Sequence, residues 1–234
     1  MGAMDALTPT CVLAVDVVIM TVREGALAIL LGERRHAPWA GHPALPGVLV
    51  RDGETETGAV RRTLTTKVDG AEVFLSQVGA FASPDRDPRG RVVSVAWGAL
   101  VSTAVAGSLC GRGSGLSLAR VSPEGDTVTD ADGAALCLAF DHATIVARTV
   151  AWLRGRLGRD LTGAEMLGET FSLRELQEVH EAVLGKAIVA TNFNTWLKRR
   201  GVVVPTGGRA DRDGRGRPGM LYRVAARPAS PWEE

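Results

Sequence analysis

The chain has 234 residues, of which 45% are hydrophobic and 23% are charged, and its formal net charge at pH 7 is +1. This composition excludes a disordered chain, and three cysteines without C-x-x-C spacing exclude a disulfide framework or a zinc knuckle. The apolar run at residues 11–22 is interrupted by Asp16 and is too short to cross a bilayer or to act as a secretory signal. We therefore expect a soluble cytoplasmic protein with no membrane partner, one or two domains and buried cysteines.

The charge is unevenly divided along the chain. Residues 1–147 carry 12 Lys and Arg against 16 Asp and Glu, whereas residues 148–234 carry 15 against 10. Between Lys186 and Arg227, ten basic residues stand against two acidic ones. Such a stretch predicts a surface for a polyanion. From composition alone, a solvated Arg-rich surface is an equal alternative.

The hydrophobic pattern of the first half predicts several strands and one helix. Two aliphatic runs separated by Arg23-Glu24-Gly25 indicate a β-hairpin, because glycine favours the turn. Val60, Leu64 and Val68 recur at helical spacing. The predicted elements are strands at 12–22, 26–31, 73–81 and 91–101, an extended segment at 44–53 and a helix at 54–68. Residues 106–133 are rich in Gly and Ser and are predicted to form a loop.

The second half has a predominantly helical pattern. A helix is predicted over 140–157, followed by a domain junction at 158–163. Ser172 and Glu175 have the spacing of a capping box, which begins a helix that ends at Gly185. A further helix at 191–200 and short strands at 202–205 and 220–225 complete the predicted order. Helix, turn, helix and two-stranded hairpin is the order of a winged helix-turn-helix.

Residues 45–70, with the sequence LPGVLVRDGETETGAVRRTLTTKVDG, resemble the Nudix box of pyrophosphate hydrolases in spacing more than in chemistry. Glu54, Arg62 and Leu64 match the family pattern. The two box glycines are replaced by Val48 and Asp69, and the three helix glutamates are replaced by Thr63, Thr66 and Lys67.

These replacements remove the family's metal ligands. Positions 63, 66 and 67 share one helix face, where carboxylates would hold divalent cations against a diphosphate. Two hydroxyls and an ammonium do not replace three carboxylates, so we predict no metal site and no useful pyrophosphatase activity. Lys67, Arg61 and Arg62 could instead contact a phosphate directly. For Glu54 we favour a structural role, paired with Arg62 or the helix dipole, over a surviving catalytic role.

Two further segments resemble Nudix domains of the ADP-ribose type. Leu31-Gly-Glu-Arg-Arg35 with Pro38-Trp39-Ala-Gly41 precedes the box, and Phe81-Ala-Ser-Pro-Asp-Arg86-Asp-Pro-Arg89-Gly-Arg91 follows it. With the box, these segments predict an effector site formed by Arg34, Arg35, Trp39, Arg62, Lys67, Arg86, Arg89 and Arg91. For any one of the last three, an ion pair that only fixes the loop is an equal alternative. His142, in the segment Phe140-Asp-His142, is predicted to make a structural hydrogen bond.

The C-terminal segments complete a resemblance to the Nudix-related transcriptional regulators of NAD metabolism. The matching segments are 171–180, Asn192-Phe193 and 217–223, and the resemblance covers residues 11–227. It implies a Nudix domain that binds ADP-ribose or a related NAD-derived effector. It also implies a homodimer whose winged helices repress operator DNA.

The second predicted helix of this motif has the pattern of a DNA-reading helix. Phe193, Trp196 and Leu197 fall on one face and are predicted to be buried, which leaves polar and basic side chains outside. Asn suits adenine edges and Lys or Arg suits guanine or phosphate, while arginines of the wing suit phosphate or minor-groove contacts. The predicted DNA-binding residues are Asn192, Asn194, Thr195, Lys198, Arg199, Arg209, Arg212, Arg215 and Arg217.

We therefore predict an α+β protein. A Nudix-like α/β/α sandwich with a mixed sheet occupies residues 8–158, and a winged helix-turn-helix domain occupies residues 159–228. The predicted function is a DNA-binding regulator, in particular a repressor, of NAD biosynthesis or salvage genes, which senses ADP-ribose or a related nucleotide and requires no cofactor. The alternative is an active Nudix hydrolase of the ADP-ribose pyrophosphatase type with non-standard metal ligands.

Overall fold

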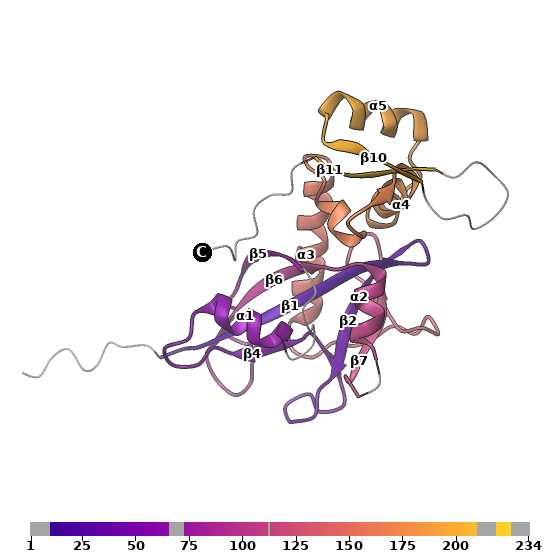
Figure 1. Ribbon diagram of the computed structural model, residues 1–234. Coiled ribbons are helices and arrows are strands. Elements are labelled where there is room, and N and C mark those ends of the chain that lie inside the picture. Colours follow the sequence, from indigo (N-terminus) through magenta and orange to yellow (C-terminus); the bar gives the residue numbers. More distant parts are fainter. Residues whose placement is uncertain (1–9, 66–72, 112, 210–218, 226–234) are drawn as a thin grey trace, which may run out of the picture.

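The computed structural model describes residues 10–65, 73–111, 113–209 and 219–225. Figure 1 shows a larger part built around β1 and, at one end of it, a smaller part that carries α5. Four predicted site residues, Lys67, Arg212, Arg215 and Arg217, lie outside the described residues. No helix in the described ranges is long and apolar enough to span a membrane.

The helices and strands follow the predicted order closely. The larger part contains β1 (Val12–Arg23), β2 (Ala26–Glu33), β3 (Pro43–Ala44), β4 (Gly47–Leu49), α1 (Glu56–Thr65), β5 (Phe74–Phe81), β6 (Val92–Leu100), α2 (Thr103–Leu109), β7 (Leu116–Val121), β8 (Val128–Thr129) and α3 (His142–Leu157). The smaller part contains the 3-10 helix η1 (Thr162–Met166), β9 (Phe171–Ser172), α4 (Leu173–Leu184), α5 (Ala190–Arg200), β10 (Val203–Arg209) and β11 (Met220–Val224).

The larger sheet is mixed, as predicted. Its strand order is β5-β6-β1-β2-β7-β8, with β3 beside β2 and β4 beside β1. β1 and β6 run parallel, whereas β1 pairs antiparallel with β2 through the predicted hairpin. Gly25 has φ 72° at that turn, a conformation that suits glycine.

Helices cover both faces of this sheet, because successive side chains of a strand point to opposite faces. On β1, Val17 and Ile19 join a buried cluster with residues of α1 and α2. The intervening Val18 and the next residue, Met20, join a second cluster with residues of α3. The predicted α/β/α sandwich is therefore confirmed.

The prediction that residues 106–133 form a loop was wrong. Residues 106–109 belong to α2, β7 pairs antiparallel with β2, and β8 pairs with β7. Leu116, Ala119 and Val121 are buried against the sheet, so packing overrides the weak strand preference of a Gly- and Ser-rich segment. The prediction of buried cysteines was also wrong for Cys11 and Cys137, which are exposed.

The smaller part has the winged-helix order. The predicted capping box is present, with Ser172 Oγ accepting from Glu175 N at 3.2 Å and the Glu175 carboxylate accepting from Ser172 N at 2.6 Å. β9, which the sequence pattern did not predict, adds a third strand to the β10–β11 hairpin. The core of this part contains Phe171, Leu176, Phe193 and Leu197, with Trp196 partly buried against them.

The two parts pack against each other through a continuous buried cluster. Met166 of η1 and Val179 of α4 belong to the same cluster as Leu153 and Leu157 of α3. Gly163 allows this approach, because a Cβ there would lie 2.8 Å from a side-chain carbon of Leu157. The position of the winged helix is thus set by close packing on the end of α3.

Gly185 allows a second close approach, between the end of α4 and the loop that joins β7 to β8. Its φ is 67°, and a Cβ there would lie 2.3 Å from the Cβ of Pro123. Gly201 ends α5 with a similar φ of 61°, but apart from its two chain neighbours no atom of the described residues would lie within 4 Å of a Cβ there. The two glycines therefore share backbone geometry and differ in packing.

We expect Gly185→Ala to lower the free energy of unfolding by about 2–4 kcal/mol, because left-handed strain of about 1–2 kcal/mol adds to overpacking. The matched variant Gly201→Ala should lose only the strain contribution, about 1–2 kcal/mol. Urea unfolding of both variants measures the difference. Equal losses would show that the contact between Gly185 and Pro123 does not constrain the fold.

Candidate functional site

A cluster of aromatic and cationic side chains lies where the loop after β2 meets the start of α3. The guanidinium carbon of Arg34 is 4.6 Å from the ring centroid of Phe140, and that of Arg89 is 5.6 Å from it. The ring of Trp39 lies 6.4 Å from the same ring and 5.1 Å from His42. Two guanidinium groups beside aromatic faces suit a ligand that combines a planar base with a diphosphate.

The backbone at this cluster adopts unusual conformations. Trp39 has φ 69° and Phe140 has φ 52°, both in the left-handed region that non-glycine residues seldom occupy. Trp39 remains 38% exposed. Such conformations persist where surrounding contacts fix them, and they are common at ligand sites. The conformation of Phe140 also explains why α3 begins at His142, two residues later than predicted.

A buried ion-pair network centred on Arg86 fixes the start of α3. Arg86 donates to both carboxylate oxygens of Asp141, at 3.0 and 2.8 Å, and to Asp16 at 3.3 Å. Asp16 also accepts from Ser94 Oγ at 2.6 Å. The side chain of Arg86 is only 4% exposed. This network joins the loop after β5 to β1, β6 and α3.

His142 makes the structural hydrogen bond that the sequence predicted. Its Nδ1 accepts from the backbone N–H of Leu45 at 3.0 Å, so the neutral ring carries its proton at Nε2, 3.5 Å from Asp16 Oδ1. Burial lowers the pKa of His142, and the neighbouring carboxylates of Asp16 and Asp141 oppose this effect. The neutral imidazole thereby attaches the segment before β4 to α3.

The predicted effector residues are divided between this cluster and other contacts. Arg34, Trp39 and Arg89 lie together around Phe140. Arg86 is buried in its ion pairs, which matches the structural alternative given for these arginines. Arg91 donates to the carbonyl of Ala82 at 2.7 Å, and Arg35 is exposed, with its guanidinium near Gly115.

Arg89 is itself held by a carboxylate on its own loop. It donates to Asp87 at 3.0 and 2.6 Å, while its side chain stays 49% exposed. Hydrogen bonds from Arg89 hold the pKa of Asp87 below its usual value. The guanidinium is therefore oriented in advance and still reaches solvent beside Phe140.

The Nudix-box residues form a structural pair. Arg62 donates to both carboxylate oxygens of Glu54, at 2.8 and 2.7 Å, and to the carbonyl of Leu49 at 2.9 Å. Hydrogen bonds, first from Arg62 and second from the backbone N–H of Arg51, lower the pKa of Glu54 to about 2. This arrangement agrees with the structural role favoured for Glu54, and it places Arg62 in an ion pair instead of in the cluster around Phe140.

The box residues that are described do not fit a divalent cation. Thr63 is buried, and its hydroxyl donates to the carbonyl of Ala59 at 2.9 Å, as a helix residue commonly does. Thr66 and Lys67 lie outside the described residues. Within the described ranges, no group of three or more His, Cys, Asp and Glu lies together as metal ligands would. Mg²⁺ prefers several charged oxygen ligands, which these side chains do not offer.

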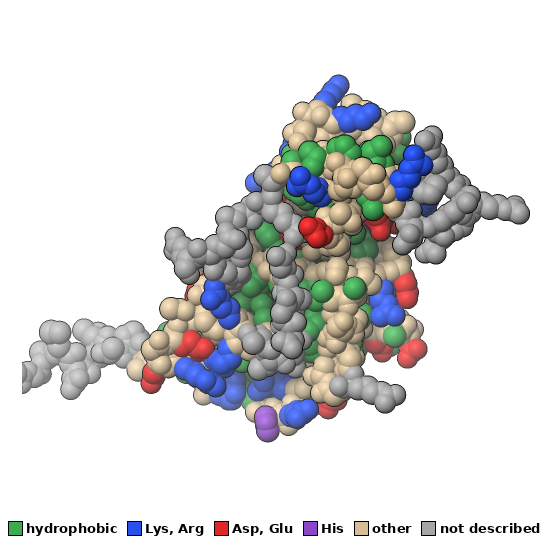
Figure 2. Space-filling view, viewed as in Figure 1, with side chains coloured by type: hydrophobic (Ala, Val, Ile, Leu, Met, Phe, Trp, Pro, Cys, Tyr) green, Lys and Arg blue, Asp and Glu red, His purple; other side chains and the backbone are tan. Residues whose placement is uncertain are grey.

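The second candidate site is the outer face of α5. Phe193 and Leu197 are buried, as predicted, and Trp196 is partly buried. Asn192, Thr195, Lys198 and Arg199 are exposed, Asn194 is partly exposed, and Arg209 is exposed at the end of β10. Figure 2 shows Lys and Arg side chains around this end of the molecule. A hollow of about 470 Å³ lies on α5 and is lined by Asn192, Thr195, Trp196, Arg199 and Arg200.

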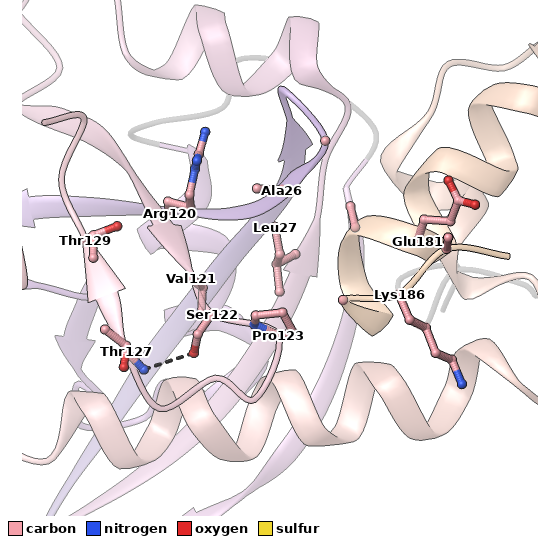
Figure 3. A pocket seen from close by; sticks show the side chains of 14 residues that line it. Ala26, Leu27, Arg120, Val121, Ser122, Pro123, Thr127, Thr129, Glu181 and Lys186 are labelled. Atoms are coloured by element: carbon pink, nitrogen blue, oxygen red, sulfur yellow. Dashed lines mark hydrogen bonds between the residues drawn. The ribbon is translucent and has the colours of Figure 1, made fainter. Parts of the chain in front are cut away.

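A separate cavity of about 560 Å³ lies between the two parts (Figure 3). Leu27, Arg120 and Pro123 line it from the sandwich, and Glu181 and Lys186 line it from the end of α4. None of the predicted site residues lines it. Charged and aromatic groups converge instead at the cluster around Phe140.

Sequence reasoning missed the central ring and its supports. The sequence pattern places Phe140 only at the start of a helix, and it shows Asp16 only as an interruption of an apolar run. A charged residue inside an otherwise buried strand was a usable signal, because an isolated buried carboxylate needs a cationic partner. Nothing local in the sequence indicates that the partner is Arg86, which lies 70 residues away.

The chain is similar to several known proteins over one or both of its parts. The family model described as the NrtR DNA-binding winged helix domain matches residues 163–224. The chain is 28% identical over 219 residues to the ADPR responsive transcriptional repressor NtrR of Acinetobacter baylyi, covering 93% of this chain and 83% of that protein. It is 33% identical over 131 residues to an ADP-ribose pyrophosphatase of Methanocaldococcus jannaschii, covering 54% of this chain and 68% of that protein.

Among solved structures, NrtR of Shewanella oneidensis in complex with a 27mer DNA has a TM-score of 0.79 and 28% identity, with 91% of this chain and 93% of that chain covered. The fold and the two sites define a protein in which a Nudix-type sandwich with an altered box precedes a winged helix. Residues 163–224 match the DNA-binding winged helix domain of NrtR, and over nearly its whole length the chain is similar to Nudix-related transcriptional regulators.

The pair of Glu54 and Arg62 predicts a specific pH dependence. The pKa of Glu54 is lower in the folded chain, about 2, than its usual value of 4.5. The pair therefore stabilises the fold above about pH 4.5, and this contribution is lost as the pH falls towards 2. We expect the stability difference between wild type and Glu54→Gln to shrink over that interval in urea unfolding at a series of pH values.

The variant Arg62→Met provides the control for this measurement. In that background only the hydrogen bond from the Arg51 backbone N–H remains, so Glu54→Gln should produce a much smaller pH-dependent difference. A difference of undiminished size in the Arg62→Met background would assign the effect to a group other than Arg62.

Proposed function

We propose that the protein is a DNA-binding transcriptional repressor of NAD biosynthesis or salvage genes, and that its Nudix domain senses ADP-ribose or a related NAD-derived nucleotide. We place the domain boundary at residues 158–159, directly after α3. The observation that carries the proposal is the outer face of α5, where polar and basic side chains are exposed above buried Phe193 and Leu197. The relatives named as a repressor and as a DNA complex support the same function.

The chemistry of α5 suits recognition in the major groove. Asn192 and Asn194 can read adenine, and Lys198 and Arg199 can bond guanine or phosphate. Thr195 donates its hydroxyl to the Thr191 carbonyl at 2.8 Å, which leaves its methyl group for apolar contact. Arg209 and the wing arginines Arg212, Arg215 and Arg217 would add phosphate contacts that fix the register on the duplex.

The cluster around Phe140 suits a nucleotide effector. An adenine ring can stack on Phe140 or Trp39, and Arg34 and Arg89 are positioned for a diphosphate. In this proposal Arg34, Trp39 and Arg89 contact the ligand, while Arg86 positions the cluster through Asp141. Arg35, Arg62, Lys67 and Arg91 remain candidates for contacts at the periphery.

We infer that the Nudix domain binds this nucleotide without hydrolysing it. Thr63 and its replaced neighbours supply no row of carboxylates, and Glu54 is engaged with Arg62. Hydrolysis of a diphosphate in this fold depends on a metal to supply the Lewis acid and the nucleophile. The runner-up, an active hydrolase, is favoured only by the identity to an ADP-ribose pyrophosphatase.

The repressor is proposed to act as a homodimer. One winged helix reads few base pairs, and two-fold symmetry supplies a second half-site. The ligand would order the arginine-bearing loops and shift the population of dimers towards a different spacing of the two α5 helices. Regulation of this kind requires binding of the nucleotide and no chemistry.

Arg199→Ala is expected to weaken binding to DNA from upstream of the chain's own gene by about fivefold to 150-fold, as for a side chain worth about 1–3 kcal/mol. If Arg199 contacts a phosphate, the slope of log affinity against log salt should fall by about 0.9. Electrophoretic shift over a range of salt concentrations measures both values. Arg23→Ala is the matched control, because it removes one exposed arginine of the β1–β2 hairpin, outside α5 and the wing, and should leave both values unchanged.

Phe140→Leu is expected to weaken ADP-ribose binding about tenfold, because it keeps an apolar side chain and removes the aromatic face that stacks a base. Phe140→Tyr keeps that face and should retain affinity. Isothermal titration measures both variants, and operator binding without ligand checks that each is folded. Equal affinity of Phe140→Leu and wild type would remove this ring from the proposed site.

Incubation of the protein with ADP-ribose and Mg²⁺ separates the repressor from the runner-up. We expect no product beyond the uncatalysed background. Turnover in the ordinary enzymatic range of about 1 per second or faster would establish a hydrolase instead.

A further inference from the structure

The helix α3 extends from the proposed effector site to the proposed DNA-reading helix (Figure 1). It begins at His142, directly after Phe140 and the Asp141 that Arg86 holds. It ends at Leu157, followed by Gly158 and Arg159. One continuous helix therefore has the two functional sites at its opposite ends.

The far end of α3 is bonded directly to α5. Arg200, the last residue of α5, donates to the carbonyl of Gly158 at 3.3 Å and to the carbonyl of Arg159. Gly158 is the C-cap of α3 and Arg159 follows it, so their carbonyls lie near the negative end of the helix dipole, where a guanidinium is favourable. The guanidinium carbon of Arg200 also lies 4.9 Å from the ring centroid of Trp196, which orients it.

The chain around these carbonyls is held firmly. Arg156 pairs with Asp160 at 2.8 Å and donates to Thr162 Oγ1 at 2.9 Å. Asp160 in turn accepts from the backbone N–H of Thr162 at 2.9 Å. These bonds close the segment after α3 into a compact turn, so the two carbonyls move with the helix.

α3 itself is suited to transmit a displacement. Its buried side chains include Ile145, Val150 and Leu153, which are fully buried in the core of the sandwich. A helix packed along one face moves as a rigid element, since a close-packed core favours discrete arrangements over continuous bending. A shift at its first turn would therefore reach its last turn.

We propose that α3 and Arg200 couple the effector site to the DNA-reading helix, with Arg200 acting as a positioning residue that fixes the orientation of α5. This inference rests on the proposed function. A nucleotide on Phe140 would alter the contacts of Asp141 and Arg86, and hence the position of α3. Arg200 would then carry this change to α5 through the carbonyls of Gly158 and Arg159.

The test compares operator affinity with and without saturating ADP-ribose, and the ratio of the two affinities measures the coupling. The principal variant is Arg200→Lys. It keeps the positive charge near DNA but lacks the planar guanidinium whose two nitrogens donate to the two carbonyls. Arg200→Ala removes both the charge and the donors. Because the readout is a ratio, a change in operator affinity common to both conditions cancels.

For wild type we expect a ratio in the usual range for allosteric proteins, about fivefold to 150-fold in either direction. Whether ADP-ribose raises or lowers operator affinity, Arg200→Lys should reduce the size of that fold-change to less than half of the wild-type fold-change, and Arg200→Ala should bring the ratio close to one. ADP-ribose affinity measured without DNA should stay within about twofold of wild type in both variants. In contrast, Arg199→Ala should lower operator affinity and keep the wild-type ratio.

The outcomes separate this inference from the proposed function. The proposed function would be overturned if the wild-type protein did not bind ADP-ribose, or if ADP-ribose did not change its operator affinity. A responsive wild type with the same ratio in both Arg200 variants would overturn the inference alone. Arg200 is exposed at the helix end, so both variants should fold, and a thermal melt within a few degrees of wild type verifies this.

Discussion

The ion pairs of Arg86 are the interaction on which the rest of the structure depends. A guanidinium that is 4% exposed bridges Asp16 on β1 and Asp141 at the start of α3. Charges taken out of water are expensive unless each is paired and hydrogen-bonded. Removing one partner of such a network typically costs about 3–5 kcal/mol, because the remaining charge stays buried. The sandwich therefore packs stably only when three segments are correctly placed relative to one another: β1, the start of α3 and the loop that follows β5.

That constraint also prepares the proposed nucleotide site. Fixing Asp141 fixes Phe140 in its left-handed conformation, and Arg34 and Arg89 then lie over the ring. A site whose groups are oriented before the ligand arrives loses less entropy on binding. The same residue that closes the sandwich thus positions the aromatic face, while its own guanidinium stays out of reach of the ligand.

Much of the fold could be predicted from the sequence because local patterns determine it. The capping box at Ser172 and Glu175 and the helix ends at Gly185 and Gly201 depend on short-range geometry, and all are present. The buried face of α5 followed from the spacing of Phe193 and Leu197. The strand β7 was missed because its identity depends on pairing with β2, which lies some 85 residues earlier in the chain.

The candidate site was harder to predict than the fold. Arg34, Trp39 and Arg89 were found through their resemblance to a family segment, whereas Phe140 became visible only through tertiary contacts. Arg86 is the opposite case. Its sequence context predicts a residue of a ligand-binding loop, but in the structure it is buried. Whether an arginine contacts solvent or a buried carboxylate depends on residues distant in the chain, which no local pattern contains.

The central claim is that nucleotide binding in a Nudix sandwich controls DNA binding by a winged helix of the same chain. The most direct test is a titration of DNA from upstream of the chain's own gene with the full-length protein, in the absence and in the presence of saturating ADP-ribose without Mg²⁺. The account predicts operator binding whose affinity changes at least about fivefold when the nucleotide is present. Operator affinity that is unchanged by ADP-ribose and by related NAD-derived nucleotides would contradict it.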